Sequence, residues 1–449
     1  MRIVDRLGVG VASELVNDQT LSAVLSAKID WERKVRGNEW VRSDPSVNVV
    51  QALRYGQDRP YLRPLLGLAR QPFYGADHRL ITAPGYDAQT GIYGVFDKAD
   101  YDLGEPTREK AERALAYLNW LIRDFPFASD SDRSAALAAM LTAAVRPSLS
   151  QAPAFSVSAT RSGSGKSYLA KLIASIAGPD DPYNVSYPSK ADEATKVVLA
   201  MLLEKPAVIL FDDMQTDWKS FGALNKALTS ATTTERLLGS SRTATARTNV
   251  LFLGTGNNIE PEQDMRRRVV SIRLTPQSAT PSLTDFDGEG PVEHTRKRRA
   301  QVVSAALTII GAFHAAGRPL ADVPPIGTFE EWSVYCRQPL LWLGEPDPAQ
   351  SLIQQVTDDS DQQALGELLD AWYLAFGARP MTVRKVVDKA ELDSDLMDVL
   401  AELPVMDGRY INPNKLGWYL KKNRGRRAGG LRIEPGEITE RKAWRVLAD

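Results

Sequence analysis

Alternating apolar and polar stretches divide the chain into strand-like and helix-like segments. Between residues 150 and 275, continuous apolar runs occur as "FSVSA" (155–159), "AVILF" (207–211), "NVLFLGTGN" (249–257) and "VVSIRL" (269–274). Helix-like segments such as "ADEATKVVLAMLLEK" (191–205) separate them. Strands that are apolar along their whole length are typical of a parallel sheet buried on both faces. Their alternation with helices predicts an α/β domain over residues 151–285.

Two helices are predicted ahead of this domain, in a helical collar over residues 106–150. In "TREKAERALAYLNWLIRDF" (107–125), apolar side chains recur at spacings of three and four: Ala111, Ala114, Leu115, Leu118, Leu121 and Ile122. The segment "DSDRSAALAAMLTAAVRP" (130–147) repeats the pattern, with an Asp/Ser cluster to cap its start and Pro147 to stop it.

Residues 1–105 are interrupted by Gly and Pro and contain only short apolar runs, so we expect a small α+β region there. Within it, "HRLITAPGYDAQTGIYGVFD" (78–97) predicts two strands joined by the turn-rich "PGYDAQTG".

The C-terminal part of the chain divides at "DDSDQQ" (358–363). Before it, residues 286–357 form a helical region that begins with a long helix over 289–317. After it, residues 358–449 predict three short helices followed by strand, turn and strand, the outline of a winged-helix module. Between Arg409 and Arg445 there are eleven Lys or Arg and three Glu, a surplus that suits a phosphate backbone or a solvated basic face.

Composition narrows the class of protein. The sequence is 43% hydrophobic and 25% charged, which is usual for globular domains. A chain of 449 residues is too long for a single hydrophobic core, so we expect several domains. We expect no membrane segment, because no apolar run is long enough. A single cysteine, Cys336, fits a reducing cytoplasm, and with three scattered histidines it argues against a zinc finger.

The segment "ATRSGSGKS" (159–167) joins the first apolar strand to a helix-like pattern. In such a turn of small residues, backbone amides can point at a polyphosphate, and the helix adds the positive end of its dipole. The residues assigned to binding the phosphates of a nucleotide are Gly163, Ser164, Gly165, Lys166 and Ser167, of which Ser167 also serves Mg²⁺. Thr160 stands where the pattern G-x-x-x-x-G-K-[ST] has its first glycine, and such a turn also occurs for structural reasons alone.

Two of the later apolar strands end in polar residues of the kind a nucleotide site uses. Asp212 and Asp213 follow directly after the strand at 207–211, where a carboxylate can serve Mg²⁺ or polarise an attacking water. We assign Asp212 to the metal and Asp213 to the water. Asn257 ends the strand at 249–257 and can orient water near the γ-phosphate. The alternatives are ordinary polar turns, in which Asn and Asp are common.

Basic residues follow these strand ends. Arg266, Arg267 and Arg268 form a run in which one guanidinium can act on the nucleotide of a neighbouring subunit, or all three can form a surface ion-pair cluster. Before the third strand, "TTTERLLGSSRTATARTNV" (232–250) predicts a hairpin with Arg242 near its tip and Arg247 at its base. It is either an ordinary edge hairpin or one that projects cations into a central pore.

Together, Lys166, "FDD", "GTGNN" and "RRRV" resemble the superfamily 3 helicases of the AAA+ ATPases. Several longer stretches are similar to the helicase part of phage and prophage primase-helicase proteins: "ITAPGYDAQTGIYGVF" (81–96), "RDFPFASDSDRSAALAAMLTAAVRPSL" (123–149), "FEEWSVYCRQPLLWLGEPDP" (329–348) and "LGWYLKKNRGRRAGGLRI" (416–433). The resemblance extends from about residue 60 to the end of the printed sequence.

The resemblance implies an ATP-driven, usually hexameric ring that moves along single-stranded or forked DNA during replication. It assigns phosphate and Mg²⁺ binding to the Gly loop, the sensing of the γ-phosphate to Asn257, and the trans-acting arginine to Arg267 or, second, Arg268. Arg242 becomes the pore-hairpin candidate. Further contacts to DNA are expected from basic residues of the hairpin base and the C-terminal module: Arg247, Lys421, Lys422, Arg424, Arg426 and Arg427.

Two departures from the family pattern accompany the loop's Thr160. Asp213 stands where AAA+ enzymes commonly have Glu, and no primase region is evident, so a separate primase or polymerase is an expected partner. Two other functions stay open: a DNA-binding initiator or scaffold in which nucleotide only locks a ring, and another P-loop motor such as a packaging ATPase. A small-molecule kinase is disfavoured, because it needs no trans-acting arginine.

Overall fold

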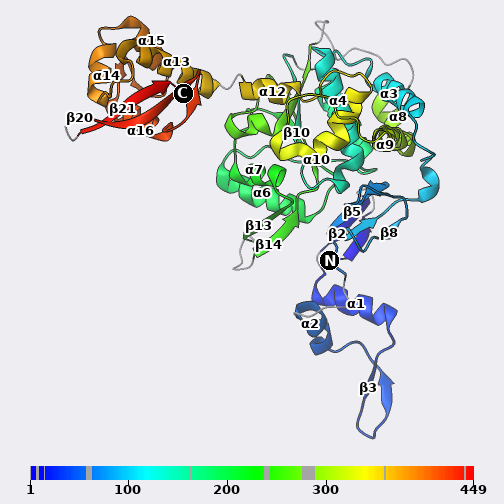
Figure 1. The fold of residues 1–449 in the computed structure, drawn as a ribbon. Helices are drawn as coiled ribbons and strands as arrows, with labels where there is room; N and C mark the ends of the chain where they lie inside the picture. Colours follow the sequence, from blue (N-terminus) through cyan, green and yellow to red (C-terminus); the bar gives the residue numbers. More distant parts are fainter. Residues whose placement is uncertain are drawn as a thin grey trace. The chain divides into compact units, whose positions relative to one another are not determined.

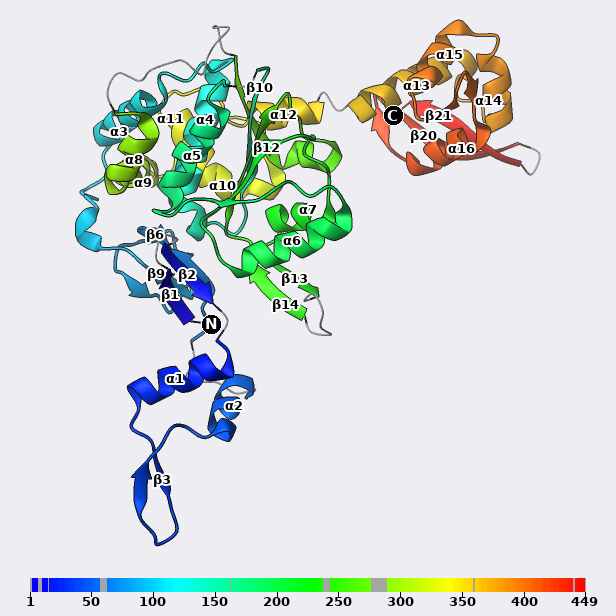
Figure 2. The same cartoon turned by 180° about the vertical axis from the view of Figure 1, so that it is seen from behind.

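The computed structural model describes residues 2–6, 10–14, 16–56, 63–161, 163–236, 243–275, 289–357, 360–438 and 441–448. The chain divides into two compact units, Met1–Ile353 and Gln354–Asp449. Figure 1 and Figure 2 show both units from opposite sides.

The N-terminal part of the first unit consists of short strands and two helices. Strand β9 pairs in parallel with β5 and antiparallel with β8, whereas the other strands pair as β1–β2, β3–β4 and β6–β7. Each helix begins at a side-chain cap, Asn17 for α1 and Ser46 for α2. The elements are β1 (Arg2–Arg6), β2 (Gly10–Glu14), α1 (Asp18–Lys28), β3 (Glu32–Lys34), β4 (Trp40–Arg42), α2 (Val47–Tyr55), β5 (Gly67–Ala69), β6 (Phe73–Tyr74), β7 (Leu80–Ile81), β8 (Gly85–Tyr86), β9 (Ile92–Gly94) and η1 (Lys98–Asp100).

The hairpin predicted for residues 78–97 is wrong in its pairing. Strand β7 pairs with β6, while β8, which lies inside the predicted turn, pairs with β9. The turn between β8 and β9 is tight because the Asp87 carboxylate accepts hydrogen bonds from the Thr90 backbone N–H (2.8 Å) and hydroxyl (2.7 Å). An Asp that bonds the backbone ahead of it makes such a turn without Gly or Pro at its start.

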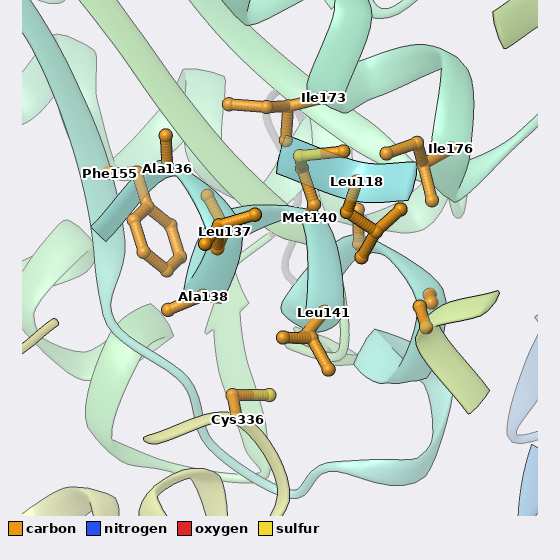
Figure 3. Packing of buried hydrophobic residues seen from close by; sticks show 14 of the residues in the cluster. Leu118, Ala136, Leu137, Ala138, Met140, Leu141, Phe155, Ile173, Ile176 and Cys336 are labelled. Carbon is orange, nitrogen blue, oxygen red and sulfur yellow. The ribbon is translucent and has the colours of Figure 1, made fainter. Parts of the chain in front are cut away.

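The two collar helices are confirmed. The buried residues of α3 (Arg108–Ile122) are the six that the spacing predicted, and α4 (Asp130–Val145) is buried around nearly its whole circumference. Their side chains join those of β10 and α5 in one core, as Leu118, Met140, Phe155 and Ile173 do in Figure 3. Burying each large apolar side chain stabilises the fold by about 1.5–3 kcal/mol.

A five-stranded parallel sheet lies at the centre of the first unit, in the order β11-β12-β15-β10-β16. Along β12, Leu210 joins the core on one face while Ile209 and Phe211 join the core on the other. This alternation explains why both faces are apolar, and it confirms the predicted α/β class. The elements are η2 (Arg146–Ser148), β10 (Ala154–Ala159), α5 (Lys166–Ala177), β11 (Tyr183–Asn184), α6 (Ala191–Leu203), β12 (Val208–Met214), α7 (Gly222–Thr229), β15 (Leu251–Asn257), η3 (Gln263–Arg267) and β16 (Val269–Leu274).

The predicted hairpin before β15 is present as antiparallel β13 (Thr232–Arg236) and β14 (Thr243–Arg247). Its tip, including Arg242, lies outside the described residues. The single helix predicted over 289–317 is two helices, α8 (Pro291–Lys297) and α9 (Arg299–Ala315), separated at Arg298. The remaining helical segments of this region are η5 (Gly327–Phe329), α10 (Glu330–Trp332), the π-helical η6 (Ser333–Arg337), α11 (Gln338–Trp342) and α12 (Gln350–Thr357).

The C-terminal unit has its own core around α13, which contains the fully buried Trp372. Its described residues form four helices, one more than predicted, and a three-stranded antiparallel sheet of β19, β20 and β21. The elements are α13 (Ser360–Phe376), α14 (Val383–Ala390), α15 (Ser394–Ala401), β17 (Met406–Asp407), β18 (Tyr410–Ile411), α16 (Pro413–Lys422), β19 (Arg427–Ala428), β20 (Leu431–Ile438) and β21 (Arg441–Ala448).

Arg146 links the end of α4 by hydrogen bonds to the segment that precedes β15. Its guanidinium is buried and donates hydrogen bonds to the carbonyls of Leu149 (2.6 Å), Thr248 (2.6 Å) and Val250 (3.0 Å). Burial lowers the pKa of Arg146 to about 10, which leaves the side chain charged at neutral pH.

We expect Arg146→Met to lower the free energy of unfolding by about 3 kcal/mol, because three buried carbonyls lose their donor. Equilibrium urea unfolding measures this change, and Arg113→Met, on the exposed face of α3, is the matched control. A loss equal to that of the control would contradict this role.

Candidate active site

The Gly loop lies between β10 and α5, at the carboxyl edge of the sheet. Gly163 and Gly165 have φ of +73° and +84°, values that side chains disfavour. Gly165 is also the N-cap of α5, so the free N–H groups of the first helical turn face the loop. Thr160 is not among the described residues with positive φ, which explains why this position tolerates a residue other than glycine.

Lys166 is the first residue of α5 and is 8% exposed. Its Nζ donates hydrogen bonds to the Arg161 carbonyl (3.1 Å) and to Asn257 Oδ1 (2.8 Å) at the end of β15. Burial lowers the pKa of Lys166, and the carboxylates of Asp213 and Asp212 oppose that shift. The Lys166 ammonium therefore links the loop to the end of β15.

The next residue of α5, Ser167, lies beside Asp212 of β12 and Thr255 of β15. Asp212 Oδ1 accepts hydrogen bonds from the hydroxyls of Ser167 (2.6 Å) and Thr255 (2.6 Å). The Thr255 oxygen in turn accepts from the Asp213 backbone N–H (3.0 Å). The start of α5 and the ends of β12 and β15 are thus linked through one carboxylate. The sequence-predicted residues Lys166, Ser167, Asp212 and Asn257 come together.

Thr255 was not identified from the sequence. A usable signal was its place two residues before Asn257 on one strand, since residues two apart share a face of a sheet. Asp213 lies where the pairing of β12 with β15 is irregular and has φ of +53°. Its carboxylate is exposed, so Thr255 fixes the backbone of Asp213 while the side chain stays accessible.

The residues assigned to Mg²⁺ have the right chemistry for it. Ser167 and Asp212 present a hydroxyl and a carboxylate close enough to share a hydrogen bond, and Mg²⁺ prefers oxygen ligands. Among the residues that the structure describes, no three His, Cys, Asp or Glu side chains gather into a metal site.

The three arginines after β15 differ in their surroundings. Arg266 Nε donates to the Pro261 carbonyl at 3.4 Å, and Arg268 donates to the carbonyl of Asp264 and pairs with its carboxylate at 3.7 Å. Arg267 is exposed, and its side chain contacts no acceptor within the described part of the chain. Of the two residues predicted as trans-acting, Arg267 is the one with its guanidinium available.

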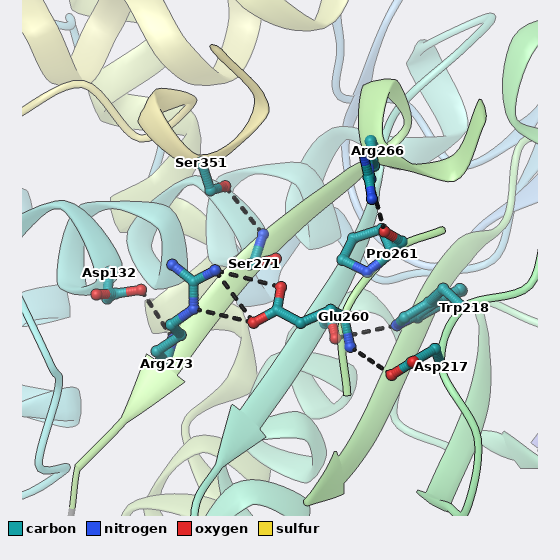
Figure 4. A network of polar contacts seen from close by, with 10 residues as sticks. Asp132, Asp217, Trp218, Glu260, Pro261, Arg266, Ser271, Arg273 and Ser351 are labelled. Atoms are coloured by element: carbon teal, nitrogen blue, oxygen red, sulfur yellow. Dashed lines mark hydrogen bonds and ion pairs between the residues drawn. The ribbon is translucent and has the colours of Figure 1, made fainter. Parts of the chain in front are cut away.

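The segment that carries these arginines is hydrogen-bonded to the loop after β12, as Figure 4 shows. The Trp218 backbone N–H donates to the Glu260 carbonyl (3.0 Å), and the Glu262 backbone N–H donates to the Trp218 carbonyl (3.0 Å). The Glu260 backbone N–H donates to Asp217 Oδ1 (2.9 Å). The Glu260 carboxylate also pairs with Arg273 of β16 at 3.2 Å. The loop that follows Asp213 therefore holds the segment that presents Arg267.

The basic residues predicted to bind DNA fall in both units. Arg247 is half-buried at the base of β14, and Arg242 lies outside the described residues. In the C-terminal unit, four cations on and after α16 are exposed: Lys421, Lys422, Arg424 and Arg427. Arg426 is half-buried, because it donates to Asn423 Oδ1 (2.9 Å) and Gln362 Oε1 (3.3 Å).

No family model matches the chain, and no curated protein does. Solved structures similar to it include the apo A form of the NrS-1 C-terminal region, at 13% identity and a TM-score of 0.37, covering 97% of this chain and 100% of that chain. Another is the JCV helicase, at 12% identity and a TM-score of 0.23, covering 59% of this chain and 72% of that one. Likeness this distant carries no argument about chemistry, so an assignment has to rest on the residues themselves. Within the described ranges, no helix combines the length and apolar character needed to cross a bilayer.

Proposed function

We propose that this protein is an ATP-driven DNA helicase or translocase that hydrolyses ATP between the subunits of a ring. The observation that carries the proposal is the meeting of Lys166, Ser167, Asp212 and Asn257 at one edge of a parallel sheet, beside a glycine loop that opens a helix. Cation, hydroxyl, carboxylate and amide are the groups that phosphoryl transfer from a nucleotide requires.

Each residue has a role that its surroundings support. The loop amides and Lys166 bind the phosphates, and Lys166 exchanges its bond to Asn257 for one to the γ-phosphate. Asn257, once released, and the exposed Asp213 orient the attacking water. Ser167 and Asp212 would hold Mg²⁺, which neutralises phosphate charge and so favours the leaving of ADP.

The proposed ring is a homo-oligomer, and the family resemblance implies a hexamer. This ring gives Arg267 its role. An exposed arginine with no acceptor among the described residues of its own unit is suited to a nucleotide bound by a neighbouring copy, where it stabilises transition-state charge. A head-to-tail contact of this kind closes into a ring when its rotation permits.

DNA is the proposed track, and α16 is the element of the C-terminal unit best suited to it. Helices α14 and α15 are joined by the three residues 391–393, as in a helix-turn-helix. However, α15 and its C-cap carry Asp395, Asp398 and Glu402, whereas α16 carries three lysines. We therefore propose a winged-helix-like module in which α16 and the basic residues after it face the phosphates.

Phage or mobile-element DNA replication is the proposed setting, with a separate primase or polymerase as partner. Steady-state ATP hydrolysis with and without single-stranded DNA, followed by strand displacement on a forked duplex, tests the proposal. We expect turnover to rise several-fold with DNA and to drive displacement. DNA binding without any turnover would instead support the initiator or scaffold function, and displacement-free pumping of duplex would support a packaging motor.

Thr255→Val tests the arrangement of the carboxylates. Valine keeps the shape of threonine but removes the hydroxyl that bonds Asp212 and the Asp213 backbone. We expect ATP turnover to fall about 10- to 100-fold, the usual cost of losing a group that orients a metal ligand, while nucleotide affinity changes little. Thr233→Val, at an equally buried threonine of β13, is the control, and wild-type turnover in Thr255→Val would contradict the role.

A further inference from the structure

A pocket of about 390 Å³ lies in the C-terminal unit, between α13, the segment after α15, and α16. It belongs to that unit alone and is separate from the nucleotide site described above. One wall is an aromatic ring. Acidic, basic and amide side chains surround this ring.

Trp418 forms the aromatic wall and is 64% exposed, whereas Trp372 of the same unit is fully buried in the core. The ammonium of Lys422 lies 5.7 Å from the centre of the Trp418 ring. A large indole left open to solvent in a pocket is a surface on which another flat ring can stack. The Lys422 ammonium over the Trp418 ring favours a ligand that carries negative charge next to its own ring.

The polar groups of the pocket suit the edge of a heterocycle. Glu367 and Glu402 present acceptors, and the Gln363 amide, which donates to Glu367 at 3.0 Å, presents both kinds of group. Arg426 is fixed at the same pocket by its bonds to Asn423 and Gln362. Fixed donors and acceptors around a ring platform are the usual way in which a base is held on its edge.

We propose that this pocket binds an unpaired nucleobase, stacked on Trp418, with its phosphate near Lys422. The inference extends the proposed DNA function, since the exposed cations Lys421, Arg424 and Arg427 of the same unit can contact neighbouring phosphates. Bases within a duplex are stacked on one another and cannot present a free face. The pocket therefore selects single strands, which the cations alone do not.

The test measures binding of the full-length protein to a fluorescent single-stranded oligonucleotide and to a blunt duplex of equal length, by anisotropy at one salt concentration. We expect Trp418→Ala to weaken single-strand binding about ten-fold, within the range for the loss of one stacked base. Duplex binding should stay unchanged, and Trp418→Phe should restore most of the loss. Tyr410→Ala removes another exposed aromatic of the unit, outside the pocket, and should have no effect.

An oligonucleotide with abasic sites separates base stacking from phosphate contacts. Wild type should bind it as weakly as Trp418→Ala binds the normal strand. Competition by a free mononucleotide at low concentration would show that the same base site is filled from solution rather than from a strand. Equal losses on both DNAs, or no loss in Trp418→Ala, would overturn the base site and leave a protein partner as occupant. If wild type binds no DNA at all, the proposed DNA function itself fails.

Discussion

Lys166→Ala is expected to reduce ATP turnover by about 10²- to 10³-fold, the cost typical of removing one preorganised charge donor from a transition state. The side chain is buried, and its Nζ already bonds two oxygens, the Arg161 carbonyl and Asn257 Oδ1. An incoming phosphate would replace those neutral acceptors with charged ones, and it would find its cation already in position. Alanine removes the cation and leaves Asp212 and Asp213 to repel the triphosphate.

Turnover is measured at saturating ATP and Mg²⁺, with and without single-stranded DNA, and nucleotide affinity is measured separately with a fluorescent analogue. Lys171→Ala, at an exposed position on the same helix, should keep wild-type turnover and controls for loss of a lysine from α5. Binding of DNA by the C-terminal unit should persist in Lys166→Ala. If turnover survives in this variant, the Gly loop is not the catalytic phosphate site.

Much of the candidate site could be predicted from the sequence because its residues stand at the ends of apolar runs. A strand buried on both faces has almost no polar residues, so Asp212 and Asn257 mark where each strand leaves the sheet. Parallel strands bring those ends to one edge, which is why residues 45 and 91 positions away meet Ser167 and Lys166.

What the sequence did not reveal depends on pairing between segments. Thr255 is one polar residue in an apolar strand, and only its contact with Asp212 distinguishes it from a satisfied core threonine. Strand β8 is two residues long, and its partner was decided by the Asp87 turn rather than by hydrophobic period. Arg426 looks like its basic neighbours in the sequence, yet its bonds to Asn423 and Gln362 make it part of a pocket.

Arg267→Ala is expected to reduce ATP turnover about 10³-fold or more, as the loss of a trans-acting arginine does in other nucleotide hydrolases. Nucleotide binding should be spared, because no contact joins Arg267 to the loop of its own subunit within the described residues. Arg113→Ala, at an exposed arginine of α3, is the matched control. Normal hydrolysis by Arg267→Ala would show that Arg267 is not the trans-acting residue, and Arg268 would then be tested.

Mixing two inactive variants distinguishes action in trans from action within one subunit. A Lys166→Ala subunit keeps Arg267, and an Arg267→Ala subunit keeps Lys166, so a contact between them in the right order contains one complete site. In rings assembled at random from equal amounts, about one interface in four is complete, since each requirement is met half the time. Activity that appears only after mixing therefore establishes a shared site. If both variants are inactive alone and the reassembled mixture stays inactive, either Arg267 acts on its own nucleotide or hydrolysis requires several intact interfaces. Mixing each variant with wild type separates these two explanations. A loss of activity in direct proportion to the variant fraction indicates independent sites, and a steeper loss indicates coupled ones.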